Sequence, residues 1–257
     1  MNIFIYGFVF TFIITFIIAI YFNWKNQLTE CFDSFPYNIC NKKKTITVNN
    51  YTFSISPIRN NPIMLELYPF LKPNECNHLI NISKEKFKRS PVVSKGGIDD
   101  IRTSYSCFLT KSGDSIISDI ENRICKFCNI DNCMLEQFQV VRYLPNQKFN
   151  YHYDWFDPTI EEGRNETKHG GQRRYTIFIY LNDLSSKEYR LNKELGTNNG
   201  KTCFKKHNIC INPKQGLGIF WKNIVDGKLN YDSLHAGIAP KYSIKYGLNV
   251  WVRERSL

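Results

Sequence analysis

The sequence predicts an α+β fold that is mainly β, with a double-stranded β-helix (jelly-roll) core backed by N-terminal helices and preceded by one transmembrane helix. The observations behind it are an uncharged apolar run at the N-terminus, two helical patterns before Met134, and a succession of short strand patterns after it. Helices followed by many short strands are typical of a β-core supported by helices. The 257 residues suffice for one such core and an anchor.

The N-terminal segment 3–22 is almost wholly apolar and carries no charged residue. About twenty helical residues span a bilayer core, so we expect residues 1–24 to form a transmembrane signal-anchor. The alternative is a cleaved signal peptide, which needs a basic n-region, a shorter apolar stretch and a small-residue cleavage site. No basic residue precedes Lys25 and no clear cleavage site is present, which favours the uncleaved anchor.

Two signals disagree about the compartment of the remaining chain. Lys25 and the run 42–44 follow the apolar segment, and the positive-inside rule then favours a cytosolic domain. Nine cysteines favour an oxidising lumen, and sequons at Asn50, Asn81 and Asn165 permit a glycoprotein. Because long domains translocate largely regardless of charge, we predict a single-pass membrane protein whose C-terminal domain lies in the lumen of the endoplasmic reticulum.

Changes in sequence character divide the chain after the anchor. Residues 25–60 are polar and rich in turn signals, which predicts a stalk leading into a first strand. Residues 61–134 are expected to be a helical support region. Residues 135–257 carry the short strand patterns and are expected to form the jelly-roll.

The support region contains two helix signals. One helix is predicted from the Pro-Asn pair at 73–74, with Asn74 as its N-cap, to about Phe87. An amphipathic helix is predicted over 113–130. Its cysteines and one that follows are interpreted as core or disulfide residues, because no second thiol or histidine pair supplies a zinc site of the usual spacing. They are Cys125, Cys128 and Cys133.

The chain is basic, with a net charge of +11. Lysines and arginines are spread along it and do not cluster with aromatic residues, so nucleic acid is an unlikely partner. The stretch 193–206, although lysine-rich, is interpreted as a solvated loop. Asn, Lys and Ile are abundant throughout, as expected from the AT-rich genome of a large DNA virus or a protist.

Two short segments contain the side chains of a metal site. His152 and Asp154 are two positions apart, so on an extended strand both project to one face, and His235 must come from a second strand. An isolated histidine is more often a core residue. Here, however, apolar and β-branched runs surround both segments. Two histidines and one carboxylate on one face of Fe(II) leave positions open for a co-substrate and O₂.

Further motifs accompany this metal triad along the chain. They are Arg102-Thr103-Ser104, Glu136 with Gln139, Tyr143 with Gln147, Arg174-Tyr175-Thr176, Tyr180-Leu181-Asn182-Asp183, Pro213 with Gly216, Ser233-Leu234-His235-Ala236, and Lys245 with Trp251. In their order and spacing, residues from about 65 to 254 resemble the catalytic domain of prolyl 4-hydroxylases, which are Fe(II)- and 2-oxoglutarate-dependent dioxygenases. The resemblance implies that His152, Asp154 and His235 bind Fe(II).

The resemblance also implies residues for the co-substrate. Lys245 is expected to bind the distal carboxylate of 2-oxoglutarate as a fixed cation, with Arg174 as the alternative. Tyr143 and Thr176 are expected to add hydrogen bonds. By the same resemblance, O₂ oxidises 2-oxoglutarate to succinate and CO₂ while a substrate carbon is hydroxylated, and L-ascorbate keeps the iron reduced.

The implied substrate is a peptidyl proline in a proline-rich or collagen-like chain, with Tyr153 and Trp251 lining the peptide groove or packing in the core. The stretch 199–204 departs from the family, which usually has Gly-Gly-Glu-Thr before a Phe, and it follows an unusually long polar insert at 185–198. We therefore keep two alternatives. One is an oxygenase acting on another peptide residue or on nucleic acid. The other is an inactive module that binds proline-rich segments, which is disfavoured because Lys245 and all three iron ligands are present.

Overall fold

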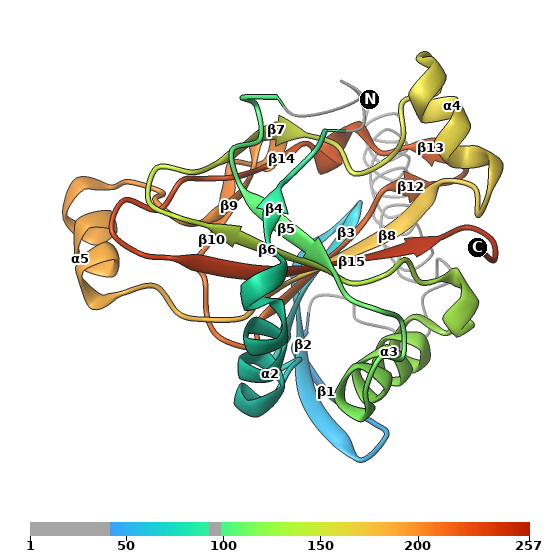
Figure 1. Cartoon of the computed structure of the whole chain (residues 1–257), viewed down its shortest axis with the longest axis horizontal. Coiled ribbons are helices and arrows are strands. Elements are labelled where there is room, and N and C mark those ends of the chain that lie inside the picture. The colour runs from blue at the N-terminus through green and yellow to red at the C-terminus, as the bar shows by residue number, and fades with distance from the viewer. Residues whose placement is uncertain (1–41, 93–98) are drawn as a thin grey trace, which may run out of the picture.

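The computed structural model describes residues 42–92 and 99–257, and two β-sheets dominate it (Figure 1). The larger sheet has the strand order β1-β2-β3-β11-β8-β15-β6-β5-β4. Its strands are β1 (Lys44–Val48), β2 (Tyr51–Asn60), β3 (Ile63–Tyr68), β4 (Lys88–Arg89), β5 (Tyr105–Phe108), β6 (Gln139–Tyr143), β8 (Arg173–Tyr180), β11 (Gly218–Lys222) and β15 (Lys245–Arg253).

The smaller sheet has the order β10-β9-β14-β7. Its strands are β7 (Phe149–His152), β9 (Thr202–Phe204), β10 (Ile209–Ile211) and β14 (His235–Gly237), and a separate ribbon pairs β12 (Ile224–Val225) with β13 (Lys228–Leu229). From β6 to β15 the chain passes repeatedly between the two sheets, and neighbouring strands are antiparallel. This crossing connectivity is what a jelly-roll core requires. The predicted mainly-β fold with supporting helices is confirmed.

Helix α2 (Pro73–Ser83) begins two residues earlier than an Asn74 cap would place it. Lys72 is the N-cap, and the Glu75 carboxylate accepts a hydrogen bond from its backbone N–H at 2.8 Å. Pro73 occupies the first helical position, where a missing N–H costs nothing and its fixed φ suits the helix. The predicted Asn74 cap is therefore wrong, because the proline and the reciprocal glutamate already define the helix start.

Helix α3 (Ser115–Cys128) confirms the amphipathic prediction over 113–130. The Asp114 carboxylate accepts from the Ile117 N–H at 2.9 Å, and Asn129 ends the helix in a left-handed conformation. Cys125 and Cys128 are unpaired thiols buried in the core. The core interpretation is thus confirmed for Cys125 and Cys128. It is wrong for Cys133, which is an exposed free thiol and forms no disulfide.

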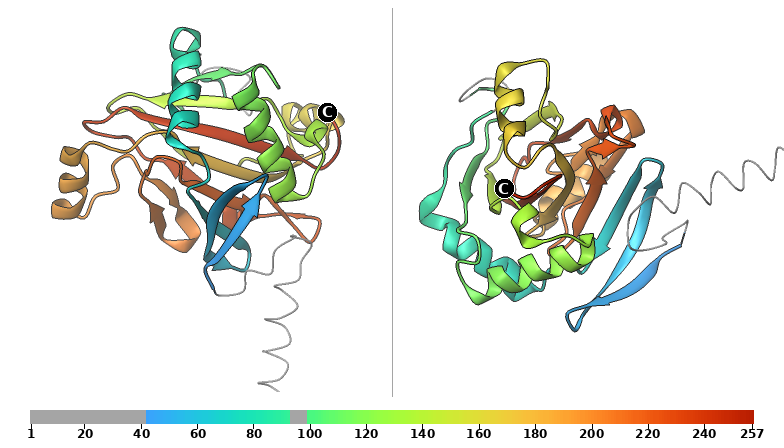
Figure 2. Two further views of the ribbon diagram at one scale, coloured as in Figure 1. Left: turned by 90° about the horizontal axis from the view of Figure 1, so that it is seen from below. Right: turned by 90° about the vertical axis from the view of Figure 1, so that its right-hand side faces the viewer.

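The two faces of the large sheet bury two separate cores. On β8, Tyr175, Ile177 and Ile179 belong to the cluster that also contains side chains of α2 and α3. The alternate residues Phe178 and Tyr180 belong to a second cluster, shared with strands of the small sheet. This alternation follows from the period of two in a strand. Figure 2 shows α2 and α3 lying against the large sheet, so the helices cover one face and leave the other to the small sheet.

The remaining helices are short and lie both before and after β7. They are α4 (Glu161–Lys168), α5 (Ser186–Leu195) and the short 3₁₀ turns η1 (Lys84–Lys86), η3 (Asn132–Met134), η4 (Lys205–His207) and η5 (Tyr231–Ser233), of which η1 and η3 precede that strand. The polar insert therefore contains a helix, α5. The solvated-loop interpretation of 193–206 is wrong toward both ends, because its first residues belong to α5 and its later residues form the buried strand β9.

The predicted anchor, residues 1–24, lies outside the described residues. Within 42–92 and 99–257 no helix combines the length and the apolar character needed to cross a bilayer. The stretch 61–134 contributes α2 and α3, and it also contributes β3, β4 and β5 to the large sheet.

Candidate active site

Paired strands of the small sheet bring the predicted metal ligands together. His152 is the last residue of β7 and His235 is the first of β14, and the two are direct partners in the antiparallel register. Asp154 follows β7 by two positions, so its carboxylate returns to the same side as His152. The one candidate metal group among the described residues is this triad, whose ligand atoms all lie within 4.8 Å of one another.

Backbone carbonyls orient both histidines toward Asp154. His152 Nδ1 lies 2.7 Å from the Asn150 oxygen, and His235 Nδ1 lies 2.8 Å from the Ser233 oxygen. Donation from Nδ1 leaves Nε2 with its lone pair, and each Nε2 lies 3.8 Å from an oxygen of Asp154. Two imidazole nitrogens and one carboxylate, converging from one side, are the donor set that suits Fe(II) with open positions. The residues present fit an iron ion.

Burial and neighbouring charges give the ligands the protonation states that metal binding needs. Burial, reinforced by His235, lowers the pKa of His152 to about 3, so its imidazole is neutral at physiological pH. Burial raises the pKa of Asp154, but the histidines of the triad, Arg173 and the hydrogen bond from Thr176 together hold that pKa below its usual range. A neutral imidazole and an ionised carboxylate are the forms that coordinate a metal.

A buried hydrogen-bond chain holds Asp154 in place. The Thr176 hydroxyl donates to Asp154 Oδ2 at 2.9 Å and accepts from Asn223 Nδ2 at 2.8 Å. The Trp221 indole N–H in turn donates to Asn223 Oδ1 at 3.1 Å. Thr176, predicted to contact the co-substrate, thus has its hydroxyl proton engaged by an iron ligand. Its assigned contact with 2-oxoglutarate stays a prediction.

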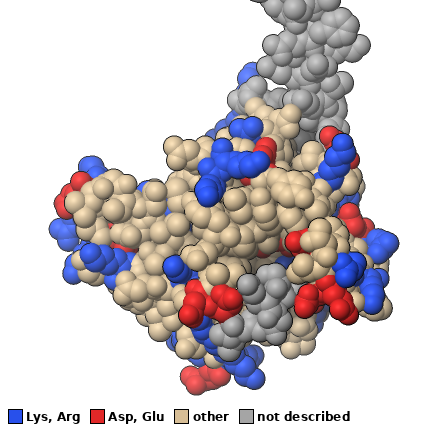
Figure 3. Space-filling view, turned by 90° about the horizontal axis from the view of Figure 1, so that it is seen from above, with Lys and Arg blue, Asp and Glu red and all other residues tan. Residues whose placement is uncertain are grey.

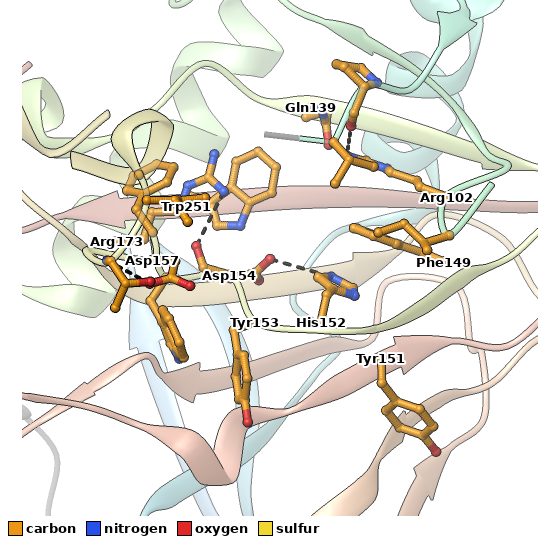
Figure 4. A pocket seen from close by; sticks show the side chains of 18 of the residues that line it. Arg102, Gln139, Phe149, Tyr151, His152, Tyr153, Asp154, Asp157, Arg173 and Trp251 are labelled. Atoms are coloured by element: carbon orange, nitrogen blue, oxygen red, sulfur yellow. Dashed lines mark hydrogen bonds and ion pairs between the residues drawn. The ribbon is translucent and has the colours of Figure 1, made fainter. Parts of the chain in front are cut away.

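A stack of side chains supports His152 on the opposite side. The Phe149 ring lies parallel to the imidazole, with 3.4 Å between the centroids, and the Arg102 guanidinium lies 4.6 Å above Phe149. Arg102 is buried and donates to the Gln139 carbonyl oxygen at 2.9 Å. Figure 4 shows this stack beside the triad. The packing restricts rotation of the His152 ring.

A small cavity of about 30 Å³ connects the triad to Lys245. Lys245 is the first residue of β15 and only 1% exposed. Its ammonium lies 3.5 Å from the Lys201 carbonyl oxygen and about 5 Å from the Tyr143 ring centre. In the described part of the chain no acidic side chain pairs with it. A buried ammonium without a counter-ion is costly, so this cavity is suited to a carboxylate.

Tyr143 lines the same cavity, as predicted for a co-substrate contact. Burial raises the pKa of Tyr143, which keeps its phenol a hydrogen-bond donor at neutral pH. Its hydroxyl would lie 3.1 Å from a Cβ placed on Gly237, so a larger residue there would crowd the ring. Arg174, the alternative cation, does not line this cavity.

A larger cavity of about 590 Å³ opens on the other side of His152 and Asp154. Tyr153 and Trp251 both line it, as predicted for a peptide groove. Figure 4 shows Tyr153 pointing away from the Asp154 carboxylate, to the same side as Tyr151. The Tyr153 ring stacks on Trp155, with 4.5 Å between centroids. The divergent stretch 199–204 lines none of it.

Several functional side chains were missed from the sequence. Phe149, Trp155, Asn223 and the Cys203–Cys210 disulfide were not singled out. Phe149 lies three positions before His152, a spacing that places the two on opposite faces of a regular strand. The β7–β14 register is shifted here, and no pattern in the sequence indicates that irregularity. The disulfide joins residues that face each other between β9 and β10, a register that no local pattern in the sequence reveals.

Comparisons with known proteins agree with this geometry. Residues 138–253 match the model of the 2OG-Fe(II) oxygenase superfamily. The chain is 33% identical over 205 residues to prolyl 4-hydroxylase 1 of Arabidopsis thaliana, covering 76% of this chain and 70% of that protein. It is 31% identical over 198 residues to a putative prolyl 4-hydroxylase of Acanthamoeba polyphaga mimivirus, covering 76% and 75%.

Solved structures show the same relationship. The viral collagen prolyl hydroxylase of Paramecium Bursaria Chlorella virus-1, in its 2-oxoglutarate complex, is 27% identical, with a TM-score of 0.55 over 74% of this chain and 95% of that one. With its iron triad and a cationic pocket beside it, the chain belongs to the prolyl 4-hydroxylase family of Fe(II)- and 2-oxoglutarate-dependent oxygenases.

Proposed function

We propose that the protein is an Fe(II)- and 2-oxoglutarate-dependent peptidyl-proline 4-hydroxylase. One observation carries the proposal: a single buried cavity is lined both by the triad and by the uncompensated ammonium of Lys245. A dicarboxylic 2-oxoacid satisfies both ends of such a cavity, because one end chelates a metal and the other is an anion. Bound Fe(II), with O₂ and 2-oxoglutarate, supplies the oxidising chemistry.

The protein's own residues then have distinct tasks. His152, Asp154 and His235 hold the metal on one side and leave the other side accessible. Lys245 neutralises the distal carboxylate at the closed end, where burial excludes water and strengthens the attraction. Tyr143 donates a hydrogen bond to the same co-substrate. Positioning and exclusion of water are the protein's contributions.

The substrate proposed is a proline-rich or collagen-like polypeptide. The larger cavity is bordered by an aromatic cluster in which Tyr231 meets Trp155 edge-on at 5.3 Å and Tyr153 at 5.8 Å. Aromatic-lined grooves favour the polyproline II conformation, which is pre-extended and loses little entropy on binding. On the face shown in Figure 3, basic and acidic side chains are interspersed, which favours a peptide over nucleic acid.

The proposal is tested by mass spectrometry. Proline-rich and collagen-like peptides are incubated with the protein, Fe(II), 2-oxoglutarate and ascorbate, which we propose as the iron reductant. A gain of one oxygen atom on proline, with one succinate formed per oxygen added, is expected. Succinate without peptide oxidation would point to another substrate. Peptide binding without any succinate would instead support an inactive binding module.

The buried ammonium gives co-substrate binding a pH dependence. Burial lowers the pKa of Lys245 from its ordinary 10.5 to about 7, and a bound carboxylate restores the charged form. Binding above pH 7 therefore takes up a proton, and the dissociation constant of 2-oxoglutarate rises with pH by up to about tenfold per unit. Calorimetry in two buffers of different ionisation enthalpy measures this proton.

Without co-substrate, the folding stability of the protein should increase with pH, whereas co-substrate binding weakens. Between about pH 7 and 10.5 the unfolded chain keeps a proton on Lys245 that the folded chain has released. The contribution of Lys245 to the free energy of unfolding therefore rises with pH in this window. Melting curves without co-substrate check it, and Lys245→Met should remove both trends. Co-substrate binding that is insensitive to pH in the wild type would contradict the assignment.

We further propose that residues 3–22 anchor the protein in a membrane, with the catalytic region in the lumen of the endoplasmic reticulum and sugars on its sequons. The viral relatives support an origin in a large DNA virus. Alkaline extraction of membranes should leave the full-length protein in the pellet, whereas a chain starting at Lys25 should be released. Recovery of a mature N-terminus downstream of Phe22 would show a cleaved signal peptide instead.

A further inference from the structure

Helix α5 contacts two segments that adjoin the Lys245 end of the co-substrate cavity. It lies in the polar insert after β8, and Figure 1 shows it at the edge of the molecule beside the turn that leads into β15. One of these segments, 241–244, immediately precedes Lys245. The other, 199–202, contains the carbonyl nearest to the Lys245 ammonium and the cavity-lining Thr202.

Glu188 connects α5 to the first segment. Its carboxylate is fully buried and accepts three backbone N–H groups, from Lys241 at 2.9 Å, Tyr242 at 2.6 Å and Ser243 at 2.9 Å. A carboxylate in this position can accept from all three, because both of its oxygens are acceptors. Ser185, the cap of α5, adds a hydroxyl contact of 3.0 Å to Ser243. Lys245 is only two residues further along.

Asn192 connects α5 to the second segment one helical turn later. Its side-chain amide donates to the Asn199 carbonyl oxygen at 2.9 Å, and its carbonyl oxygen accepts from the Asn199 N–H at 3.0 Å. Asn192 is 7% exposed. Two residues after Asn199, the backbone of this segment is hydrogen-bonded to the chain after β14. There the Lys201 carbonyl oxygen accepts from the Ile238 N–H at 2.9 Å. Residues 188 and 192 lie on the same face of a helix.

We propose that α5 is a positioning element for the co-substrate, in which Glu188 and Asn192 set the separation between Lys245 and the opposite wall of the cavity. The inference rests on the proposed function, because it assigns the distal carboxylate of 2-oxoglutarate to that cavity. Neither residue touches the co-substrate or the metal ligands. They are positioning residues that act through Lys245 and Lys201.

Substituting Glu188 by glutamine tests the first connection. The amide keeps the shape but has only one acceptor oxygen, and its NH₂ group faces backbone donors. Segment 241–243 then loses some of its hydrogen bonds to residue 188, and the position of Lys245 is less restricted. We expect the dissociation constant and KM for 2-oxoglutarate to rise roughly tenfold, because hydrogen bonds to charged groups are among the stronger ones. The peptide KM and the kcat at saturating 2-oxoglutarate should change little.

The experiment uses the full-length, Fe(II)-loaded protein, with anaerobic calorimetry of 2-oxoglutarate and iron binding alongside turnover. Asn192→Ala is the second variant and should weaken 2-oxoglutarate binding in the same direction. Glu194→Gln is the matched control, because this exposed glutamate lies on the same helix. In both test variants the affinity for 2-oxoadipate, which is one carbon longer, should rise relative to the affinity for 2-oxoglutarate. A less rigid cavity wall discriminates less between co-substrates of different length.

The outcomes separate the positioning role from general loosening. The positioning role is supported if the dissociation constant and KM for 2-oxoglutarate rise in both variants. Iron affinity should stay unchanged in both, and the Glu194→Gln control should behave like the wild type. Unchanged 2-oxoglutarate constants, or an equal rise in the peptide KM, would overturn the positioning role. If Glu188→Gln melts below the assay temperature, Asn192→Ala alone decides. A wild-type protein that binds no 2-oxoglutarate would instead overturn the proposed function and this inference together.

Discussion

Replacing His235 with alanine should abolish 2-oxoglutarate turnover and weaken Fe(II) binding by more than about 100-fold, since losing only an outer partner of a metal ligand typically costs 10–100-fold. The variant leaves two ligands, and an aspartate whose ionisation His235 favours. Succinate formation in a single turnover and anaerobic iron titration measure the two effects. His152→Ala and Asp154→Ala should behave alike, because the triad acts as one unit.

The control for this series is His169→Ala, since His169 is exposed and contributes its backbone carbonyl, not its ring, to the fold. It should retain wild-type turnover. Melting temperature separates loss of the site from loss of the fold, because His235 is itself buried. A His235→Ala protein that consumed 2-oxoglutarate at the wild-type rate would show that the ligand assignment is wrong.

Lys245→Ala should raise the 2-oxoglutarate requirement by two orders of magnitude or more. The substitution leaves a carboxylate facing a buried cavity without its cation, and a broken buried charge pair costs roughly 3–5 kcal/mol. Each 1.4 kcal/mol corresponds to about a tenfold change in affinity. Iron binding should stay near the wild-type value, because Lys245 lies at the other end of the cavity and is not a ligand.

Lys245→Arg should keep partial activity, because it keeps the charge but crowds a small cavity. The apparent KM for 2-oxoglutarate in both variants decides the question. Lys241→Ala is the control, since this exposed lysine lies on the same turn and its backbone N–H is retained. An unchanged KM in Lys245→Ala would transfer the role to another cation such as Arg174, although Arg174 does not line the cavity.

The features that the sequence predicted well have local causes. Helix α3 followed from an apolar period near 3.6, which is a short-range signal. The pairing of His152 with Asp154 followed from the two-residue period of a strand. Asn74 was mistaken for the N-cap because a polar residue after a proline can be either the cap or part of the first helical turn. The hydrogen bond from the Lys72 N–H to Glu75 decides between the two. All of these depend on residues within a few positions of each other.

The features that the sequence did not predict depend on tertiary contacts. Helix α5 has no apolar stripe, because its buried side chains are Glu188 and Asn192. A search for hydrophobic periodicity therefore interprets it as loop. Strand β9 is short and follows a lysine, so its burial appears only when β14 pairs with it. Burial of polar residues by hydrogen bonding is specified by the partners and not by the segment itself.

The Cys203–Cys210 bridge has a practical consequence, because β9 adjoins the strand that carries an iron ligand. Cys203 pairs in register with Ala236, the neighbour of His235. The site therefore places a reduced metal ion beside a disulfide that links β9 to β10. Thiol reagents attack disulfides through the thiolate, whereas reductants without a thiol do not use this exchange route. Preparations kept in dithiothreitol should then lose activity that ascorbate alone preserves.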